Sequence, residues 1–293
     1  MRPTTRFRRL LKRPGLILAP FVFDAYQAKI AEAVGFPLLY MTGFGTAAAR
    51  GYPDVGLVTQ TEMVQNARYI ASAVRLPVLC DADTGYGNPI NVWRTVREYE
   101  AAGVAGIHIE DQVFPKKCGF FEGKQVVPLE EHVQKIRAAL DARRDKDFVI
   151  IARTDALAVN GWEDTLRRCR AYYEAGADLV FVDGIRTQED LEVYARELRD
   201  IPKLYNGMLR PAKEIEALGF KIMIAGGTIG VIYKALKDAF TELKRKGTVS
   251  PSRMEGRDSI TDLLGLPQIY EMERRYGVSD IAPSRASPRL PAV

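Results

Sequence analysis

Eight short apolar runs, each followed by a stretch with helical periodicity, constrain this chain more than any other feature. Strands that alternate with helices form a parallel sheet, and eight such units predict closure into a (β/α)8 barrel of the TIM type. A doubly wound open sheet is the alternative, but no GxGxxG motif follows the first run. The predicted strands are Leu16–Ala19, Pro37–Met41, Val78–Asp81, Gly106–Glu110, Phe148–Arg153, Leu179–Val182, Lys203–Asn206 and Lys221–Ala225.

The composition, with 47% hydrophobic and 27% charged residues, is that of an ordinary soluble globular protein. Part of the net charge of +5 comes from a basic run before residue 14. No cleavable apolar segment follows it, so we expect a solvated helix rather than a transit peptide or a nucleic-acid arm. No apolar run approaches membrane-spanning length, and we expect neither membrane nor nucleic-acid partners. Three cysteines without metal-like spacing favour a reducing, cytoplasmic setting.

Three segments are expected along the chain. Residues 1–248 form the barrel, and residues 249–278 form a helical extension beyond it. The stretch LLGLPQIYEM in this extension presents an apolar face with no barrel position left to cover. It can pack on the same protein or, at least as readily, on a neighbouring subunit. The tail, residues 279–293, is rich in proline, serine and arginine and is predicted to be disordered.

Acidic residues follow the third predicted strand, in CDADTGYGNP. Asp81 and Asp83 are two apart, so their carboxylates share one face of an extended chain. Two adjacent carboxylates repel unless a cation lies between them, and hard oxygen ligands suit Mg²⁺, with Mn²⁺ as a substitute. Glu110, at the end of the next strand, can join the same site. A helix cap and a turn acid are the simpler alternative.

Other polar residues follow further strands, where active sites of such barrels lie. Arg153 is a candidate clamp for a carboxylate or phosphate, although a salt bridge to a neighbouring acid explains it as well. The turn that begins at Thr42 has backbone N–H groups for a carboxylate or phosphate, and a mere tight turn explains its glycines equally. The remaining candidates are Gly43, Phe44, Asp54, Asp183 and Asn206.

The stretch IHIEDQVFPKKCG alternates like a strand and breaks at Pro115 into a loop with a thiol beside cations. This layout is typical of a catalytic loop, and Cys118 is its reactive candidate. Only two histidines occur in the chain, so a His-rich zinc or triad site is hard to build. His108 is interpreted as a core histidine or one that supports the site. Cys80 and Cys169 are assigned to core packing.

The stretches MTGFGTAAA, PDVGLVT, DADTGYGN, HIEDQVFPKKCG, IARTDA and FVDG together resemble the isocitrate lyase and phosphoenolpyruvate mutase superfamily. The resemblance implies an eight-stranded α/β barrel whose C-terminal helix is exchanged between subunits, in homotetramers. It implies Asp81 as the main Mg²⁺ ligand, with Asp54, Asp83 and Glu110 bound through water. It implies substrate contacts from Tyr40, Thr42, Gly43, Phe44, Gly119, Arg153, Asp183 and Asn206.

The loop Lys116, Lys117, Cys118, Gly119 resembles the KKCG motif of the lyase branch, whose cysteine protonates the enolate left after carbon–carbon cleavage. Phosphonopyruvate-forming mutases carry an asparagine in this loop instead. Two residues depart from the superfamily pattern, with Phe120 in place of a histidine and Asp183 in place of a glutamate. Beside its two lysines, the thiol of Cys118 is expected to have a low pKa.

These features predict a Mg²⁺-dependent lyase that cleaves a 2-hydroxy di- or tricarboxylate of the methylisocitrate or dimethylmalate type. Its products are pyruvate or glyoxylate and a second carboxylic acid. The alternatives are a phosphonomutase resembling carboxyphosphonoenolpyruvate mutase and an oxaloacetate-type decarboxylase or hydrolase. A non-catalytic barrel that binds a metabolite is the alternative from another class.

Overall fold

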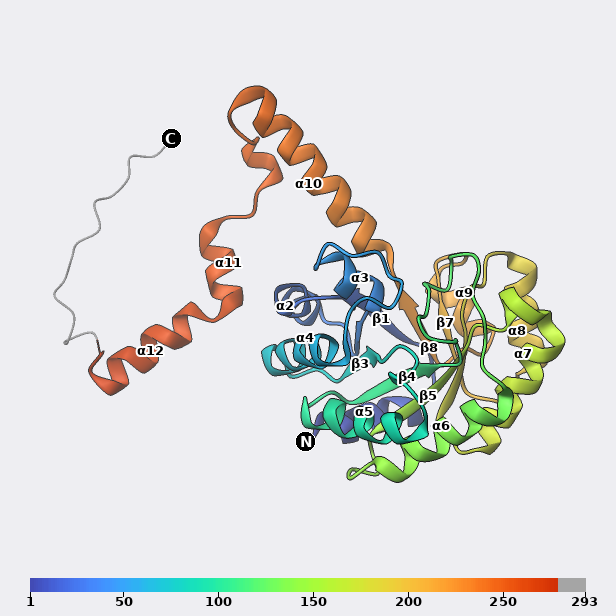
Figure 1. The fold of residues 1–293 in the computed structure, drawn as a ribbon. Coiled ribbons are helices and arrows are strands. Elements are labelled where there is room, and N and C mark those ends of the chain that lie inside the picture. The colour runs from blue at the N-terminus through green and yellow to red at the C-terminus, as the bar shows by residue number, and fades with distance from the viewer. Residues whose placement is uncertain (279–293) are drawn as a thin grey trace. The chain divides into compact units, whose positions relative to one another are not determined.

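Residues 1–278 are described by a computed structural model whose centre is a closed barrel of eight parallel strands (Figure 1). Neighbours in sequence are neighbours in the barrel, and the pairing of the first strand with the last closes it. The predicted fold class is confirmed. The strands are β1 (Ile17–Val22), β2 (Leu39–Met41), β3 (Val78–Asp81), β4 (Gly106–Glu110), β5 (Val149–Thr154), β6 (Leu179–Val182), β7 (Lys203–Asn206) and β8 (Ile222–Ala225).

Helices surround the barrel, and local signals explain where several of them begin and end. Thr59 and Glu62 form a reciprocal capping box at the start of α4, and Asn88 caps α5. Gly35, with φ of +99°, ends α2 in the left-handed conformation that favours glycine. The helices around the barrel are α1 (Pro3–Lys12), α2 (Ala25–Val34), α3 (Gly43–Ala48), α4 (Gln60–Ala73), α5 (Pro89–Ala101), α6 (Leu129–Ala142), α7 (Leu157–Glu174), α8 (Gln188–Glu197) and α9 (Ala212–Ala217). A further helix, α10 (Gly227–Lys246), follows β8 and has no buried residue.

The core has an inner layer inside the barrel and outer layers between strands and helices. On β4, Ile107 and Ile109 pack outward with the residues of the surrounding helices, whereas His108 points inward. Phe7 on α1 is fully buried and belongs to the inner cluster. The predicted N-terminal helix is therefore present, but the expectation that it is simply solvated is wrong. Its apolar side packs against residues of the barrel interior, because the amino ends of the strands leave apolar surface to cover.

The chain divides into two compact units, Met1–Lys237 and a second that begins at Asp238. The second unit holds the end of α10, a 3-10 turn (Pro251–Arg253), α11 (Arg257–Leu264) and α12 (Leu266–Tyr276). Gly265, with φ of +92°, separates α11 from α12, so the described part of the predicted extension contains two helices rather than one. The tail predicted to be disordered, residues 279–293, lies outside the described residues. Within residues 1–278, no helix has the length and apolar character needed to span a membrane.

Candidate active site

A turn after β2 brings backbone N–H groups to the carboxyl end of the barrel. Thr42 caps α3, with its hydroxyl oxygen accepting a hydrogen bond from the Gly45 N–H at 3.3 Å. The Gly43 N–H donates to Asp81 Oδ2 at 3.2 Å. A Cβ at Gly43 would come within 2.5 Å of that oxygen, so a larger residue would push the carboxylate away. The turn therefore packs directly against Asp81, the first predicted metal ligand. Phe44, in the same turn, is partly exposed.

Asp81, the last residue of β3, is only 4% exposed. Its Oδ1 accepts the Asp83 N–H at 2.9 Å. Burial by itself would raise the pKa of Asp81, but the charges of Lys116 and Arg153 and this N–H hold the pKa below its ordinary value. Asp81 is therefore ionised and available to a cation at neutral pH.

Lys116 reaches from the loop after β4 into this group of acids. Its Nζ lies 2.6 Å from Asp54 Oδ1 and 2.8 Å from Asp83 Oδ1, and its side chain is 2% exposed. Burial would lower the pKa of Lys116, but the surrounding carboxylates raise it well above its usual value. Burial first, and then the nearby charges of Asp81 and Asp54, raise the pKa of Asp83 to about 6. The predicted acids do gather at one place, with an ammonium among them.

Arg153 on β5 is surrounded by carboxylates. Its guanidinium contacts Glu110 Oε2 at 3.2 Å, Asp155 Oδ2 at 2.9 Å and Asp183 Oδ2 at 2.6 Å. Asn206, at the end of β7, donates from Nδ2 to Asp183 Oδ1 at 3.0 Å. The sequence left two interpretations of Arg153 open, a clamp for a bound carboxylate or phosphate and a salt bridge to a neighbouring acid. The structure contains the salt bridge.

Glu110 leaves buried oxygen atoms without hydrogen bonds. Neither of its side-chain oxygens has a hydrogen-bond partner within the described chain, and burial raises its pKa well above the ordinary value. Among residues 1–278, no three His, Cys, Asp or Glu side chains converge as direct ligands of one ion. Mg²⁺ commonly keeps several waters and takes one or two carboxylates directly. The donor set of Asp81 with more distant acids fits such a hydrated ion, whose waters would satisfy the oxygens of Glu110.

The loop of residues 115–123, here called the Cys118 loop, folds over these groups. The Cys118 N–H donates to the Asp54 carbonyl oxygen at 3.0 Å. Gly119 lies so close to Asp183 that a Cβ would come within 2.0 Å of Oδ2. Arg186 donates to the Phe120 carbonyl oxygen at 2.7 Å. A side chain at position 119 would hold the loop away from the site.

The two lysines of the loop have different surroundings. Lys116 is buried among the acids, whereas the Lys117 ammonium contacts the Glu122 carbonyl oxygen at 3.1 Å in an exposed position. The Gln112 side chain holds the Lys117 backbone with two hydrogen bonds. Gln112 Oε1 accepts from the Lys117 N–H at 2.9 Å, and Gln112 Nε2 donates to the Lys117 carbonyl oxygen at 2.7 Å. Lys117 therefore contributes its backbone to the loop, and its ammonium points away from the acids.

The thiol of Cys118 is half-buried, and burial raises its pKa to about 11. The nearby carboxylates of Asp54 and Asp183 act in the same direction. The expectation of a low pKa is wrong, because the charge of Lys116 is taken up by carboxylates and that of Lys117 is directed elsewhere. A thiol that stays protonated at neutral pH keeps a proton that it can donate.

His108 supports the site from the barrel interior. The Tyr40 hydroxyl lies 2.8 Å from His108 Nε2, which is 3.8 Å from Asp81 Oδ1. Burial lowers the pKa of His108 to about 4, so the ring is neutral at pH 7. The structure thus places His108 where the sequence interpretation had it, in the core beside the predicted ligand.

The sequence model of the phosphoenolpyruvate phosphomutase family matches residues 7–244. This chain belongs to that family. The resemblance drawn from the motifs, to the superfamily that this family shares with isocitrate lyase, is confirmed, and so is the prediction of an enzyme.

Individual members of the superfamily that resemble this chain carry out different reactions. The 2,3-dimethylmalate lyase of Eubacterium barkeri is 43% identical over 94% of this chain and 99% of that protein. The chloroplastic carboxyvinyl-carboxyphosphonate phosphorylmutase of Arabidopsis thaliana is 38% identical over 93% of this chain and 84% of that protein. A solved structure of oxaloacetate acetylhydrolase has a TM-score of 0.89 at 37% identity, covering 94% of this chain and 99% of that one.

Three charged residues of this family member's site were missed from sequence. Asp155 contacts Arg153 and Lys124, and it could have been found because it lies two residues after Arg153 in an extended chain. Asp111 accepts the Asp155 N–H at 2.9 Å and the Thr154 hydroxyl at 2.7 Å. Lys124 carried no signal, since nothing in a loop sequence tells which way its ammonium points.

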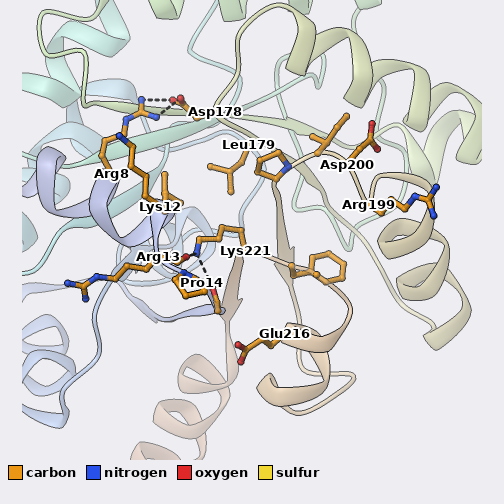
Figure 2. A pocket seen from close by; sticks show the side chains of 16 residues that line it. Arg8, Lys12, Arg13, Pro14, Asp178, Leu179, Arg199, Asp200, Glu216 and Lys221 are labelled. Carbon is orange, nitrogen blue, oxygen red and sulfur yellow. Dashed lines mark hydrogen bonds and ion pairs between the residues drawn. The ribbon is translucent and has the colours of Figure 1, made fainter.

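A cavity of about 650 Å³ lies at the other end of the barrel, away from these residues (Figure 2). Arg8 there pairs with Asp178 at 2.5 Å, and the Lys221 ammonium donates to the Arg13 and Gly15 carbonyl oxygens. The size of this cavity does not identify it as the active site. In a barrel of this kind the reacting groups lie where the strands end, and the cavity lies where they begin.

Proposed function

We propose that the chain is a divalent-metal-dependent carbon–carbon lyase acting on a 2-hydroxy di- or tricarboxylate of the dimethylmalate or methylisocitrate type. The observation that carries this proposal is the protonated thiol of Cys118, held by its loop over the cluster of buried acids. Small carboxylic acids or phosphonates appear in the names of the relatives described above, and one of those relatives is a lyase.

Asp81 is the proposed direct ligand of Mg²⁺ or Mn²⁺, with Asp83, Asp54 and Glu110 holding its waters. When bound, such an ion stabilises negative charge that develops on the oxygens of the 2-oxo acid product. The turn of Thr42, Gly43 and Phe44, with Tyr40 before it, is proposed to bind the carboxylate next to the reacting carbon. Arg153, Asp183 and Asn206 line the remaining side of the substrate.

In the proposed reaction the substrate hydroxyl gives its proton to a carboxylate of the buried acid cluster and becomes a carbonyl, as the bond between its carbon and the neighbouring carbon breaks. The bonding electrons stay on the neighbouring carbon as an enolate, and the Cys118 thiol gives that carbon its proton. The closed Cys118 loop excludes water while the enolate exists, and Gly119 packs against Asp183 to complete the cover. Cysteine in this loop favours the lyase over the phosphonopyruvate-forming mutases, whose loop carries asparagine.

Phe120 and Asp183 bear on the substrate range. Phe120 is 43% exposed, and its ring cannot donate the hydrogen bond that the usual histidine offers to a distal carboxylate. Of the two substrate types named above we therefore propose the dimethylmalate type, a diacid with an apolar or small group near the loop. Efficient cleavage of isocitrate or methylisocitrate would count against this choice, because each directs a carboxylate at the loop.

A panel of 2-hydroxy diacids and phosphonates, assayed with Mg²⁺ for 2-oxo acid release, tests the proposal. Release of pyruvate or glyoxylate together with a second acid is the expected result. A new carbon–phosphorus bond seen by phosphorus NMR would establish the phosphonomutase instead. Release of acetate and oxalate from oxaloacetate would establish a hydrolase of the kind named in the structural comparison.

We also propose that the segment of residues 249–278 packs on another copy of the chain, in a homotetramer of helix-swapped dimers. Ile269, Tyr270 and Met272 on α12 are each 45% to 50% exposed, so this helix keeps apolar surface for a partner. Truncation after residue 248 should lower the oligomeric state in light scattering. A truncated protein that stays folded in the full-length state would refute this proposal.

A further inference from the structure

We propose that Lys124 is a positioning residue that holds the Cys118 loop closed by joining the Gly119 carbonyl to the Asp155 carboxylate. The inference rests on the proposed role of Cys118 and extends it to a residue outside the reacting groups. It concerns a lysine that touches neither the predicted metal ligands nor the thiol.

The Lys124 ammonium is buried and has two partners. Its side chain is 1% exposed, and Nζ lies 2.5 Å from the Gly119 carbonyl oxygen and 3.0 Å from Asp155 Oδ1. A buried ammonium is costly unless it is paired and hydrogen-bonded. Opening the loop would take away the carbonyl oxygen and leave the Asp155 contact alone. The closed loop is therefore the state in which this ammonium is best satisfied.

Asp155 connects the loop to the substrate end of the site. Its Oδ2 accepts from Arg153 Nε at 2.9 Å, and Arg153 contacts Asp183 at 2.6 Å. Gly119 packs directly against Asp183. Contacts thus run in a closed ring from Gly119 through Lys124, Asp155, Arg153 and Asp183 back to Gly119. Each member restrains the next, so loop closure and the position of Arg153 depend on one another.

The Cys118 backbone is fixed on both sides of the thiol. The Cys118 N–H donates to the Asp54 carbonyl oxygen at 3.0 Å, and the carbonyl oxygen of the following residue, Gly119, accepts from the Lys124 ammonium. Losing either anchor frees one side of the residue. Lys124 supplies the anchor on the side that faces Asp183.

Arg186 also contacts the loop, but in a different environment. It donates to the Phe120 carbonyl oxygen at 2.7 Å, and both residues are exposed. An exposed charged contact is screened by water and stabilises little, whereas a buried charge-assisted hydrogen bond is stronger. We therefore assign the main closing contact to Lys124 rather than to Arg186.

Alkylation of Cys118 by iodoacetamide, followed by mass spectrometry, tests this assignment without any substrate or metal. Cys80 and Cys169 are fully buried and serve as internal references. Lys124→Met should raise the alkylation rate of Cys118 by about tenfold or more, because the loop loses its buried charged contact. Lys124→Arg keeps the charge and should restore much of the protection.

Lys203→Met is the matched control. Lys203 is also buried, at 1% exposure, and its ammonium contacts the Leu198 and Gly219 carbonyl oxygens at the amino end of the barrel. This variant loses a comparable lysine without touching the loop, so Cys118 should react at the wild-type rate. An equal increase in Lys203→Met would show general destabilisation and overturn the proposal.

A wild-type alkylation rate in a folded Lys124→Met protein would also overturn it. Should that variant fail to fold, Lys124→Gln gives the same test, since its amide can still donate to Gly119 but carries no charge for Asp155. An intermediate rate supports the proposal, and an unchanged rate refutes it. Because no turnover is measured, absence of lyase activity would refute the proposed reaction and leave this result standing.

Discussion

The two ends of the barrel both carry many charged residues, and they differ in how those charges are balanced. At the amino end, Arg8 pairs with Asp178 and Lys221 binds two backbone carbonyl oxygens. Helix carboxyl termini gather at this end of such barrels, and their carbonyl groups favour cations. Arg8 and Lys221 thus have their partners within the protein, in contacts that stabilise the fold.

At the carboxyl end the acids outnumber the bases. Within residues 1–278, seven buried carboxylates and four cations form one connected group of contacts and near neighbours. The cations are Lys116, Lys124, Arg153 and Arg168, and the acids are Asp54, Asp81, Asp83, Glu110, Asp111, Asp155 and Asp183. Burial of unmatched charge is costly. The excess of acid at this end, rather than the size of a cavity, is what supports the proposed cation site.

The largest expected effect comes from removing the central acid. Asp81→Ala should reduce Mg²⁺-dependent turnover by about 10³-fold or more, because an ion held mainly by this carboxylate is lost. Steady-state assays with titrated Mg²⁺ measure it, and Asp200→Ala, which removes an exposed acid at the amino end, is the control for losing an acid elsewhere. Undiminished activity in the presence of a metal chelator would contradict the assignment.

Removal of the proton donor should have the next largest effect. Cys118→Ser should lower turnover by about 10²- to 10⁴-fold, since a hydroxyl is too weak an acid to protonate the enolate. Binding of a 2-oxo acid product, measured by calorimetry, should survive because none of its proposed contacts involves sulphur. Serine is nearly isosteric with cysteine, so turnover within about tenfold of wild type would mean that Cys118 only fills space.

The acidic surroundings of Cys118 should also be visible in its pH dependence. With a pKa raised to about 11, the thiol should react with iodoacetamide mainly above pH 10, and the alkylation rate should reach half of its maximum near pH 11. In the urea-unfolded chain the midpoint should return towards that of an ordinary thiol, because burial is the main cause of the shift. Stopped-flow alkylation across pH measures both, and a folded-state midpoint below 9 would show that the lysines dominate after all.

The smallest effect on activity is expected at the amino end. Lys221→Met removes hydrogen bonds to the Arg13 and Gly15 carbonyl oxygens and should lower the free energy of unfolding by about 1 kcal/mol. Turnover should stay within about twofold of wild type, since the charge balance of the other end is untouched. Urea unfolding and the lyase assay measure the two quantities. A large loss of activity with little loss of stability would break the comparison between the ends.

Several strands, and the polar residues at their ends, could be predicted from the sequence because the patterns that indicate them are local. The strands Val78–Asp81, Gly106–Glu110, Leu179–Val182 and Lys203–Asn206 have the predicted bounds. Each is a short run with a polar residue as its last member or directly after it. Parallel strands bring their carboxyl ends to one edge, so the polar residues at these ends, Asp81, Glu110, Asp183 and Asn206, could be placed together without any coordinates.

The partners of those residues were decided only by the tertiary structure. Lys116 and Lys117 are adjacent, yet one ammonium is buried among acids and the other is exposed, and a loop has no periodicity to predict which. Burial and the carboxylates of distant segments raise the pKa of Cys118, whereas its lysine neighbours in the sequence had predicted a low pKa. The periodicity of apolar residues is a property of the local chain, so it can be recognised in the sequence alone. Charge balance and desolvation depend on which residues folding brings together, and for Lys124 only the folded structure shows these partners.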